Sequence, residues 1–324
     1  MRRLLVTRAT QAAVVVAIVT TLAFALVHLA PGDPFGSSID DPSVTSDMRA
    51  RQRALWGYDR PLPEQYLDWV GNLSRGEFGW SHSRGEPVGR VLRETVPHTF
   101  LLMGTSLLIG LAAGAALGTW QAARHGTVAE RVTGAATLVA LSIPDFLLAL
   151  GALALIAVRW RWLPAGGMVD AALHDSLGTA GRALDILRHL VLPAGTLALL
   201  TTAAVSRYHR VAMLTVLPED FVRTARAKGA NERAVIVRHA LRNALGPLIT
   251  MTGLLFPALF GGAVFVESRF AWPGMGLTMV NAVGGRDYPL VLAGVLVSSV
   301  LVAVGGALAD VLGALADPRV SRLG

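Results

Sequence analysis

The residues of this sequence that could do chemistry are few, and they do not combine into a catalytic or metal-binding set. The chain of 324 residues has no cysteine, which excludes disulfides, thiolate metal ligands and cysteine nucleophiles. Neither HxxxH nor HxH spacing occurs among the eight histidines: 28, 82, 98, 125, 174, 189, 209 and 239. The serines Ser106, Ser142 and Ser206 have no histidine at an evident motif spacing. The sequence therefore predicts neither a metal site nor an enzyme.

The single lysine of the chain also excludes a phosphate-binding loop. A Walker A loop needs Gly-Lys followed by Ser or Thr, whereas Lys228 is followed by Gly229. We therefore expect this chain to bind no ATP in such a loop and no other cofactor. Energy from ATP would have to come from a separate protein.

Asp145 is a charged residue within an otherwise uncharged apolar stretch. A carboxylate midway along a membrane-crossing helix is costly and marks a functional hypothesis, here a place in a translocation path. Pro144 before it predicts a break or kink, and the carboxylate could face a wet cavity and meet an ammonium group. Alternatively, it caps backbone N–H groups freed by the proline or pairs with an arginine. Both interpretations stay open.

The elements that must position these residues are apolar helices. Hydrophobic residues make up 53% of the chain and charged residues only 16%, against about 25% charged in a soluble domain. A bilayer core about 30 Å thick needs roughly 20 apolar residues in a helix. Six stretches meet or nearly meet this length: 9–30, 98–123, 132–158, 189–206, 244–266 and 288–309. We therefore expect an all-α polytopic membrane protein with six crossings, in which small residues at 110, 113, 114 and 118 allow close helix approach.

The arginines orient these crossings. Because cytoplasmic loops carry an excess of Lys and Arg, we expect the N-terminus inside. The inner side then holds the basic residues 2, 3, 8, 124, 131, 207, 210, 223, 226, 228, 233, 238, 242, 319 and 322. Both termini are cytoplasmic in this topology, and the net charge of +7 reflects the membrane rather than nucleic acid. The first stretch exceeds the 7–15 apolar residues usual for a signal peptide, so we expect it to be retained.

The segment 31–97 is polar and long enough for a small lobe outside the membrane. Helical spacing is predicted over 46–55 and 63–73. Aromatic residues could form the core of this lobe or anchor it at the membrane interface: Trp56, Tyr58, Tyr66, Trp69, Phe78 and Trp80. We expect residues 1–96 to form the first crossing and the outer lobe, 97–317 the main membrane domain with the loop 218–247, and 318–324 an inner tail.

The inner loop 218–247 has the most informative pattern. Pro218, Glu219 and Asp220 suit the start of a helix, and Gly229 stands where this helix must stop. One face of the helix is apolar, with Phe221, Val222 and Ala225. Asn231 caps a second helix with apolar positions at 234, 235, 237, 240, 241 and 244. Such a unit either lies on the membrane surface or docks into another protein.

This loop resembles that of a known family. The run 220–229 (DFVRTARAKG), followed by 238–245 (RHALRNAL) and Pro247, resembles the cytoplasmic EAA loop of binding-protein-dependent ABC importers, in particular the dipeptide and oligopeptide permeases. The Glu-Ala-Ala of that loop reads Arg223-Thr224-Ala225 here, so only Ala225 and Gly229 fit the general pattern strictly. Further motifs similar to this family occur in order along the chain: 28–34, 57–63 with 65–66, 75–79, 266–267, 272–276, 286–289 and 317–319.

The resemblance implies a type I ABC importer permease fold with a small extracytoplasmic lobe after the first helix. This chain would be one of two homologous permease subunits that together form the translocation path. Two cytoplasmic ATPase subunits would hold ATP and magnesium, and an extracytoplasmic solute-binding protein would deliver substrate. The helix 219–228 would be the coupling helix that enters a groove on the ATPase, with Gly229 at the sharp turn and the contact made by Glu219, Asp220, Phe221, Val222 and Ala225.

Three residues after the fifth crossing form a second candidate site. Glu267, Trp272 and Gly274 are candidates for a contact with the binding protein or for a gate. An interfacial turn anchored by Trp272 is an equal alternative.

The implied location is a bacterial inner membrane, and the implied substrate is a di- or oligopeptide. Nickel chelates, glutathione and oligosaccharides are alternatives within the same importer class. A secondary transporter is less favoured, because it would give the loop 218–247 no role.

Overall fold

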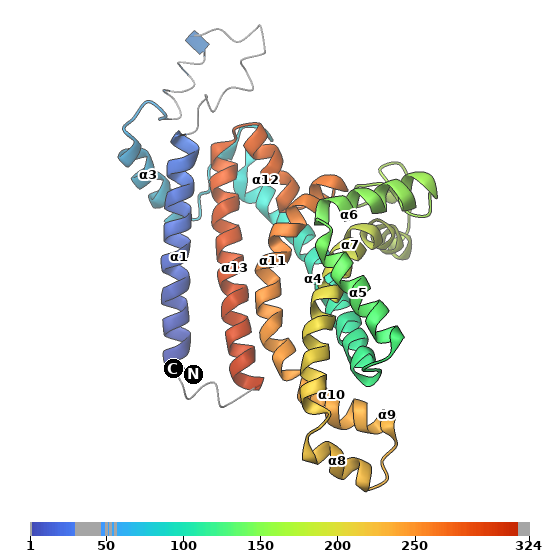
Figure 1. The fold of residues 1–324 in the computed structure, drawn as a ribbon. Coiled ribbons are helices and arrows are strands. Elements are labelled where there is room, and N and C mark those ends of the chain that lie inside the picture. The colour runs from blue at the N-terminus through green and yellow to red at the C-terminus, as the bar shows by residue number, and fades with distance from the viewer. Residues whose placement is uncertain (1, 30–46, 49–50, 52–53, 55–56, 317–324) are drawn as a thin grey trace.

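The computed structural model describes residues 2–29, 47–48, 51, 54 and 57–316. Long helices run side by side, and short helices lie at both of their ends (Figure 1). The helix predicted over 46–55 falls largely outside the described residues, and the tail 318–324 falls outside them entirely. The helix predicted over 63–73 is confirmed as α3 (Leu62–Ser74).

Four helices among the described residues are long and apolar enough to cross a membrane: Val6–Leu29, Val88–Ala123, Thr179–Val216 and Tyr288–Ala307. They belong to α1 (Arg2–Leu29), α4 (Val88–Ala123), α7 (Thr179–Val216) and α13 (Tyr288–Ala316). A fifth crossing results if α5 (Val128–Ser142) is joined to α6 (Asp145–Ala152) and the π-helix η2 (Leu153–Arg159). The α11 helix (Gly246–Arg269) lies at the position of the predicted fifth stretch. The polytopic helical character is confirmed, while the count of six stays a prediction.

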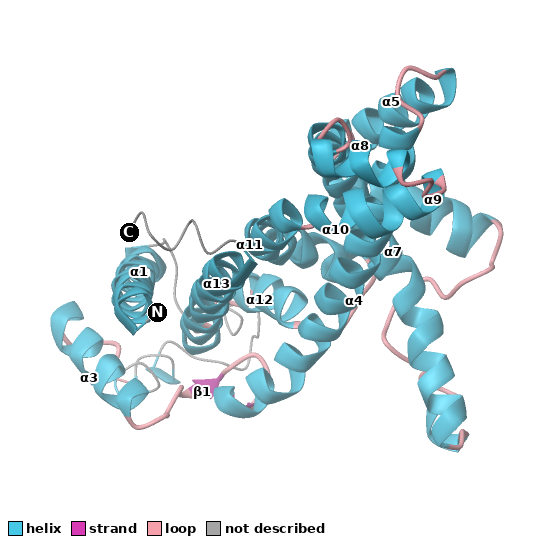
Figure 2. Ribbon diagram, turned by 90° about the horizontal axis from the view of Figure 1, so that it is seen from below, coloured by secondary structure: helices cyan, strands magenta, loops and turns pink. Residues whose placement is uncertain are grey.

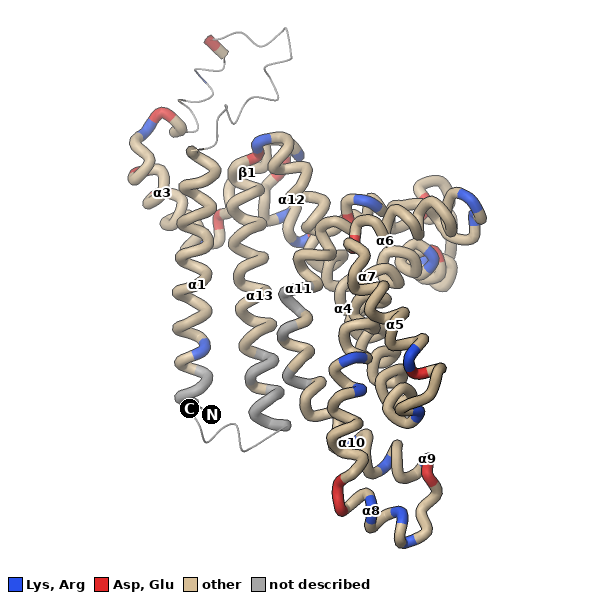
Figure 3. Tube along the Cα trace, in the orientation of Figure 1, with Lys and Arg blue, Asp and Glu red and all other residues tan. Residues whose placement is uncertain are grey.

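Two of these helices extend well beyond the apolar stretches that predicted them. α4 has 36 residues and α7 has 38, so each is about 55 Å long at 1.5 Å per residue and exceeds the bilayer core. Charged residues end the apolar stretch, but they do not end the helix. The division expected between residues 96 and 97 therefore falls inside α4. Figure 3 shows that Lys, Arg, Asp and Glu gather near the ends of the long helices and in the short helices.

α4 and α7 approach each other closely along a row of glycines. A Cβ on Gly110 would lie 2.5 Å from Thr201, and one on Gly114 would lie 2.6 Å from Val205. One on Gly118 would lie 2.6 Å from the backbone oxygen of residue 206. The predicted close approach is confirmed for these three glycines, which are spaced four residues apart and leave no room for a side chain. Ala113, which the prediction also included, is exposed.

The third predicted stretch is broken at its proline, as expected. α5 and α6 are bent by 101° between Ser142 and Asp145, and α6 projects sideways in Figure 1. Ile143 is extended, with φ −87° and ψ 125°, as the steric effect of a following proline requires. The break therefore has a local cause in Pro144.

Three short elements lie at the end opposite to α8 (Asp220–Ala227): α3, a hairpin of β1 (Trp80–Ser81) and β2 (Glu86–Pro87), and α12 (Met275–Gly284) (Figure 3). The turn η3 (His174–Ser176) precedes α7. Viewed from below, α1 lies at one edge beside α13, with α11 and then α4 and α7 on the far side (Figure 2). Phe24 of α1 contacts the rings of Tyr66 and Trp69 in α3, so aromatic packing joins α3 to the first helix.

Candidate functional site

The predicted docking loop forms a helical unit below the long helices (Figure 1). It consists of α8, α9 (Glu232–Ala234), the π-helix η4 (Val235–Ala240) and α10 (Leu241–Ala244). The predicted helix 219–228 is confirmed to within one residue at each end. The predicted cap is also confirmed, because the Ala234 N–H donates to the side-chain oxygen of Asn231 at 2.7 Å.

Gly229 ends α8 in the left-handed region, with φ +80°. Its N–H donates to the Arg226 carbonyl at 2.9 Å, and the Ala230 N–H donates to the Ala225 carbonyl at 3.2 Å. This pair of bonds is a Schellman motif, which satisfies carbonyls at the helix end. A Cβ on Gly229 would meet no atom within 4 Å, so the backbone conformation, and not a lack of space, favours glycine.

α8 turns one face inward and one face outward. Val222 is 0% exposed and Ala225 is 7% exposed, and both pack with Val235. Phe221 is 43% exposed, and Glu219 and Asp220 are exposed as well. The structure therefore divides the predicted contact face. Val222 and Ala225 hold α8 on its own unit, and Phe221 is the apolar side chain directed outward.

An ion pair spans the turn at Gly229. Arg226 donates to both oxygens of Glu232, from Nη2 at 2.8 Å and from Nε at 3.2 Å. The hydrogen bond lowers the pKa of the Glu232 carboxyl and raises the pKa of Arg226. This two-pronged geometry links α8 to α9 across the turn. A spacing of six residues across a turn is not a helix pattern, so sequence reasoning missed the pair.

The second helix departs from the predicted apolar face. Val235, Ala240 and Ala244 are buried as predicted, but Val237 is 54% exposed, so its assignment to that face was wrong. The cause is η4, where the π-helical turn contains more than 3.6 residues. Ile236 packs instead against the buried cluster that includes Met213 of α7.

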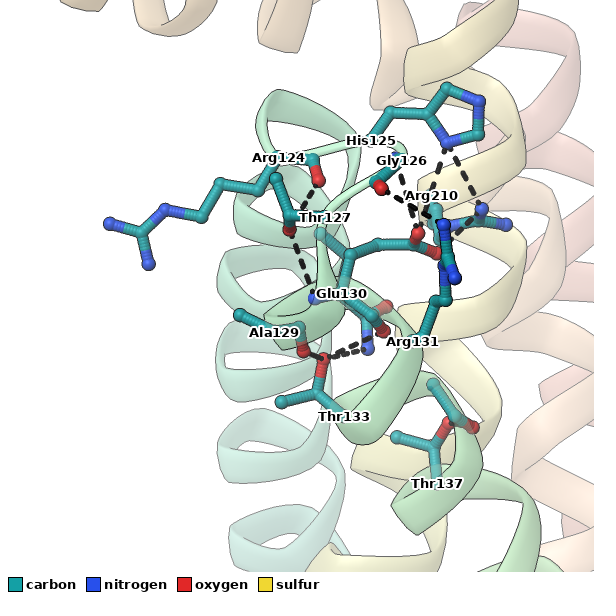
Figure 4. A network of polar contacts seen from close by, with 12 residues as sticks. Arg124, His125, Gly126, Thr127, Ala129, Glu130, Arg131, Thr133, Thr137 and Arg210 are labelled. Atoms are coloured by element: carbon teal, nitrogen blue, oxygen red, sulfur yellow. Dashed lines mark hydrogen bonds and ion pairs between the residues drawn. The ribbon is translucent and has the colours of Figure 1, made fainter.

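A largely buried ion pair joins α5 to α7 near the same end of the molecule (Figure 4). Arg210 Nη2 lies 2.7 Å from Glu130 Oε1, and the two side chains are 27% and 10% exposed. The Glu130 N–H donates to Thr127 Oγ1 at 3.3 Å, and its carboxylate accepts the Gly126 N–H at 3.4 Å. Since α7 ends at Val216, this pair fixes α5 to the part of α7 that leads into α8.

The Glu130 and Arg210 pair was missed because its partners lie on different helices. Thr127 followed by Glu130 is a capping-box signal that the sequence does contain. That signal predicts the start of α5, and it does not predict the arginine from α7.

At the opposite end, Glu267 is fully buried and caps α12. Its Oε1 accepts the Thr99 hydroxyl at 2.7 Å, and its Oε2 accepts the Leu277 N–H at 3.0 Å. Thr99 Oγ1 in turn accepts the Met275 N–H at 2.8 Å. A Cβ on Gly274 would overlap the Glu267 side chain. The carboxylate therefore occupies the N-terminus of α12, where the helix dipole favours a negative charge.

Trp272 lies in the same buried cluster, and the group of Glu267, Trp272 and Gly274 is called the lock below. It is 0% exposed, and its Nε1–H donates to the His98 carbonyl at 3.0 Å. The structure thus brings the predicted residues Glu267, Trp272 and Gly274 together. Because these residues are buried, they do not fit a direct contact with a second protein or an anchor at the membrane interface. Their bonds join α4, α11 and α12 instead.

Asp145 lies in the first turn of α6. Its Oδ1 accepts the Phe146 N–H at 2.8 Å, and its Oδ2 would be 3.2 Å from a Cβ on Gly262 of α11. Among the described residues no arginine pairs with it. The geometry agrees with the capping interpretation, and a role in a translocation path stays a proposal.

Asp287 joins the hairpin of β1 and β2 to the start of α13. This fully buried carboxylate accepts hydrogen bonds from the hydroxyls of Ser81 at 2.5 Å and Ser83 at 2.7 Å. It also accepts the Leu290 N–H at 3.3 Å. From the sequence alone, 286–289 is identified only as a family motif. In the structure, Asp287 of this motif holds the hairpin against the start of α13.

Comparisons with known proteins agree with this arrangement. Residues 106–322 match the family described as "Binding-protein-dependent transport system inner membrane component", and residues 1–103 match its N-terminal component. The chain is 38% identical over 303 residues to the oligopeptide transport system permease protein AppB of Bacillus subtilis, covering 93% of this chain and 94% of that protein. It is 37% identical over 317 residues to the di/tripeptide transport system permease protein DppB of Pseudomonas aeruginosa, with the same coverage. It is 39% identical over 283 residues to the oligopeptide transport system permease protein OppB of Mycobacterium bovis, covering 86% of each.

Proposed function

Because the chain belongs to the family of binding-protein-dependent transport system inner membrane components, we propose that it is a permease subunit of an ATP-driven importer in a bacterial inner membrane. A second homologous permease subunit completes the translocation path. Two cytoplasmic ATPase subunits hold ATP and magnesium, and an extracytoplasmic solute-binding protein delivers the substrate. Lys228 cannot serve a Walker A loop, which supports the assignment of hydrolysis to a separate chain.

The observation that carries this proposal is the α8 unit. Its helix α8 presents the large apolar side chain of Phe221, with Glu219 and Asp220 beside it. We propose that this face enters a groove on the ATPase. Val222 and Ala225 then transmit movement by their packing on Val235, since a helix that is firmly packed on its neighbour moves with it. Gly229 provides the turn.

The proposed topology has six crossings and both termini in the cytoplasm. The first residues of α1 and the last residues of α13 lie at the same end as α8 in Figure 1, which supports this orientation. We assign 1–96 to the first crossing and an extracytoplasmic lobe, 97–317 to the main membrane domain and 318–324 to a cytoplasmic tail. The lobe is supported by α3 and the hairpin, which lie at the end opposite to α8.

A peptide is the proposed substrate, because the relatives at 37–39% identity are named as permeases for oligopeptides and for di- and tripeptides. Nickel chelates, glutathione and oligosaccharides are the alternatives. We assign the lock of Glu267, Trp272 and Gly274 to an outer gate, because it ties three helices together. Asp145 is a candidate for the path, and unchanged uptake kinetics of Asp145→Asn over a peptide panel would make it structural.

Reconstitution tests the whole proposal. The chain is combined in proteoliposomes with the second permease, the ATPases and the binding protein, and uptake and ATP hydrolysis are measured together. We expect the binding protein with peptide to stimulate hydrolysis, and peptide to accumulate only with ATP. Uptake that follows an ion gradient without ATPases would show a secondary transporter. Accumulation of a nickel chelate instead of peptide would replace the substrate.

A further inference from the structure

A pocket of about 530 Å³ lies at the outer end of the molecule, away from the α8 unit. Its lining includes Arg161, Trp162 and Asp170 from the segment between η2 and α7, and Arg188 and His189 from α7. The volume is in the range of small-molecule sites, roughly 300–1,000 Å³. The segment between η2 and α7 is bonded to the chain beside the lock, because the Gly167 N–H donates to the carbonyl of Phe270, two residues before Trp272, at 2.8 Å.

Two guanidinium groups in this pocket have no side-chain partner among the residues that the structure describes. Within the part of the chain that the structure describes, neither Arg161 nor Arg188 makes a side-chain hydrogen bond or an ion pair, and both are exposed. Arg161 also has φ +56°, a left-handed conformation that is rare for residues other than glycine and asparagine. Such strain concentrates at ligand clamps, and here it belongs to one of the two free cations.

The acidic groups nearby do not neutralise these arginines. The Asp185 carboxylate is occupied by His174 at 2.7 Å and His189 at 3.1 Å. Asp170 uses Oδ1 to accept the N–H groups of Ala172 and Leu173, while its Oδ2 has no bond among the described residues. The pocket therefore combines two unpaired guanidinium groups with one partly free carboxylate oxygen.

We propose that this pocket binds the C-terminal carboxylate of a peptide, with the Asp170 oxygen facing its ammonium group, before the peptide passes the outer lock. The inference rests on the proposed function as a peptide importer. A carboxylate accepts the planar fork of an arginine through two hydrogen bonds. A lipid headgroup with a negative phosphate and no cation fits less well, because Asp170 would repel it, whereas a zwitterionic peptide satisfies both signs of charge. A zwitterionic headgroup such as phosphatidylethanolamine also carries both signs, and the displacement test below separates it from the peptide.

A binding titration on the assembled transporter tests this site without ATP and without binding protein. The probe is dialanine, followed by saturation-transfer NMR in detergent, and dialanine amide is the ligand control because it lacks the carboxylate. We expect Arg161→Gln and Arg188→Gln each to raise the Kd roughly tenfold, as for the loss of a charged hydrogen-bonding partner. Arg159→Gln is the matched protein control, since Arg159 is exposed and next to the pocket but not part of its lining.

Assembly of each variant is verified by size-exclusion chromatography, and these exposed arginines should not affect it. Equal binding of dialanine and its amide would overturn the proposal, as would an unchanged Kd in both variants. Displacement of dialanine by added phosphatidylethanolamine would assign the pocket to a lipid headgroup and also overturn it. Failure of the proposed function is a separate result, because it would appear as a loss of ATP-dependent uptake in the unmodified protein.

Discussion

Gly229→Val should uncouple ATP hydrolysis from uptake. The residue has φ +80°, and an L-amino acid in the left-handed region costs about 1–2 kcal/mol. A Cβ there would touch nothing within 4 Å, so the expected effect comes from the backbone conformation and not from a clash of the Cβ. A penalty of this size changes an equilibrium by roughly 5- to 30-fold. We therefore expect the population in which α8 has left its position on Val235 to rise by this factor.

The assay compares substrate transported with ATP hydrolysed in proteoliposomes that contain the whole transporter. Gly229→Asn is the conservative variant, because asparagine tolerates the left-handed region, and it should retain most of the coupling. Gly76→Val is the positional control. Gly76 has φ +78° and equally open surroundings but lies at the opposite end of the molecule.

Two results would refute this reasoning. Normal transport per ATP in Gly229→Val, with the ATPases still bound, would show that the Schellman turn does not hold the coupling geometry. Equal uncoupling by Gly76→Val would show that general destabilisation, and not the position of α8, causes the effect.

Three further predictions concern the packing of the long helices. Arg210→Gln leaves the mostly buried Glu130 carboxylate without its cation, so we expect a loss of about 3–5 kcal/mol and a lower Tm in detergent, with partial recovery in the Arg210→Gln and Glu130→Gln double variant. Gly114→Val should prevent the close approach of α4 to α7 and lower the yield of folded protein, whereas Gly134→Val, where a Cβ meets nothing within 4 Å, should not. Glu267→Gln places an amide donor against the Thr99 hydroxyl and the Leu277 N–H at the start of α12, so we expect the free energy of unfolding to fall by about 1–3 kcal/mol. An unchanged Tm would contradict a stabilising role of the Glu267 carboxylate.

Local signals in the sequence were reliable where one residue decides the outcome. Gly229 and Asn231 marked a helix end and a helix start because their backbone and capping preferences act over a few residues. Pro144 marked the break between α5 and α6 for the same reason. Helix lengths were less reliable, because a charged residue limits how much of α4 or α7 can lie in lipid without ending the helix.

The orientation of side chains was harder to predict. Val222 and Ala225 have the composition of a docking face, yet they are buried against the neighbouring helix of the same chain. Val237 fell on the predicted apolar face only while the turn was taken as 3.6 residues, and the π-helix η4 turned it outward. Hydrophobicity alone does not say whether the partner of an apolar face is the same chain or another one.

The amino-acid sequence by itself determined the membrane character of the protein, its apolar helices and the position of the α8 unit, because these depend on composition, periodicity and single-residue backbone preferences. Only the tertiary structure decided which charges meet. Glu130 pairs with Arg210 of another helix, and Glu267 caps a helix that begins eight residues later. Arg161 and Arg188 line one pocket, where neither side chain has a partner within the described part of the chain. The physical reason is that an ion pair or a buried hydrogen bond depends on distances between segments far apart in the chain, and these distances are fixed only when the helices pack.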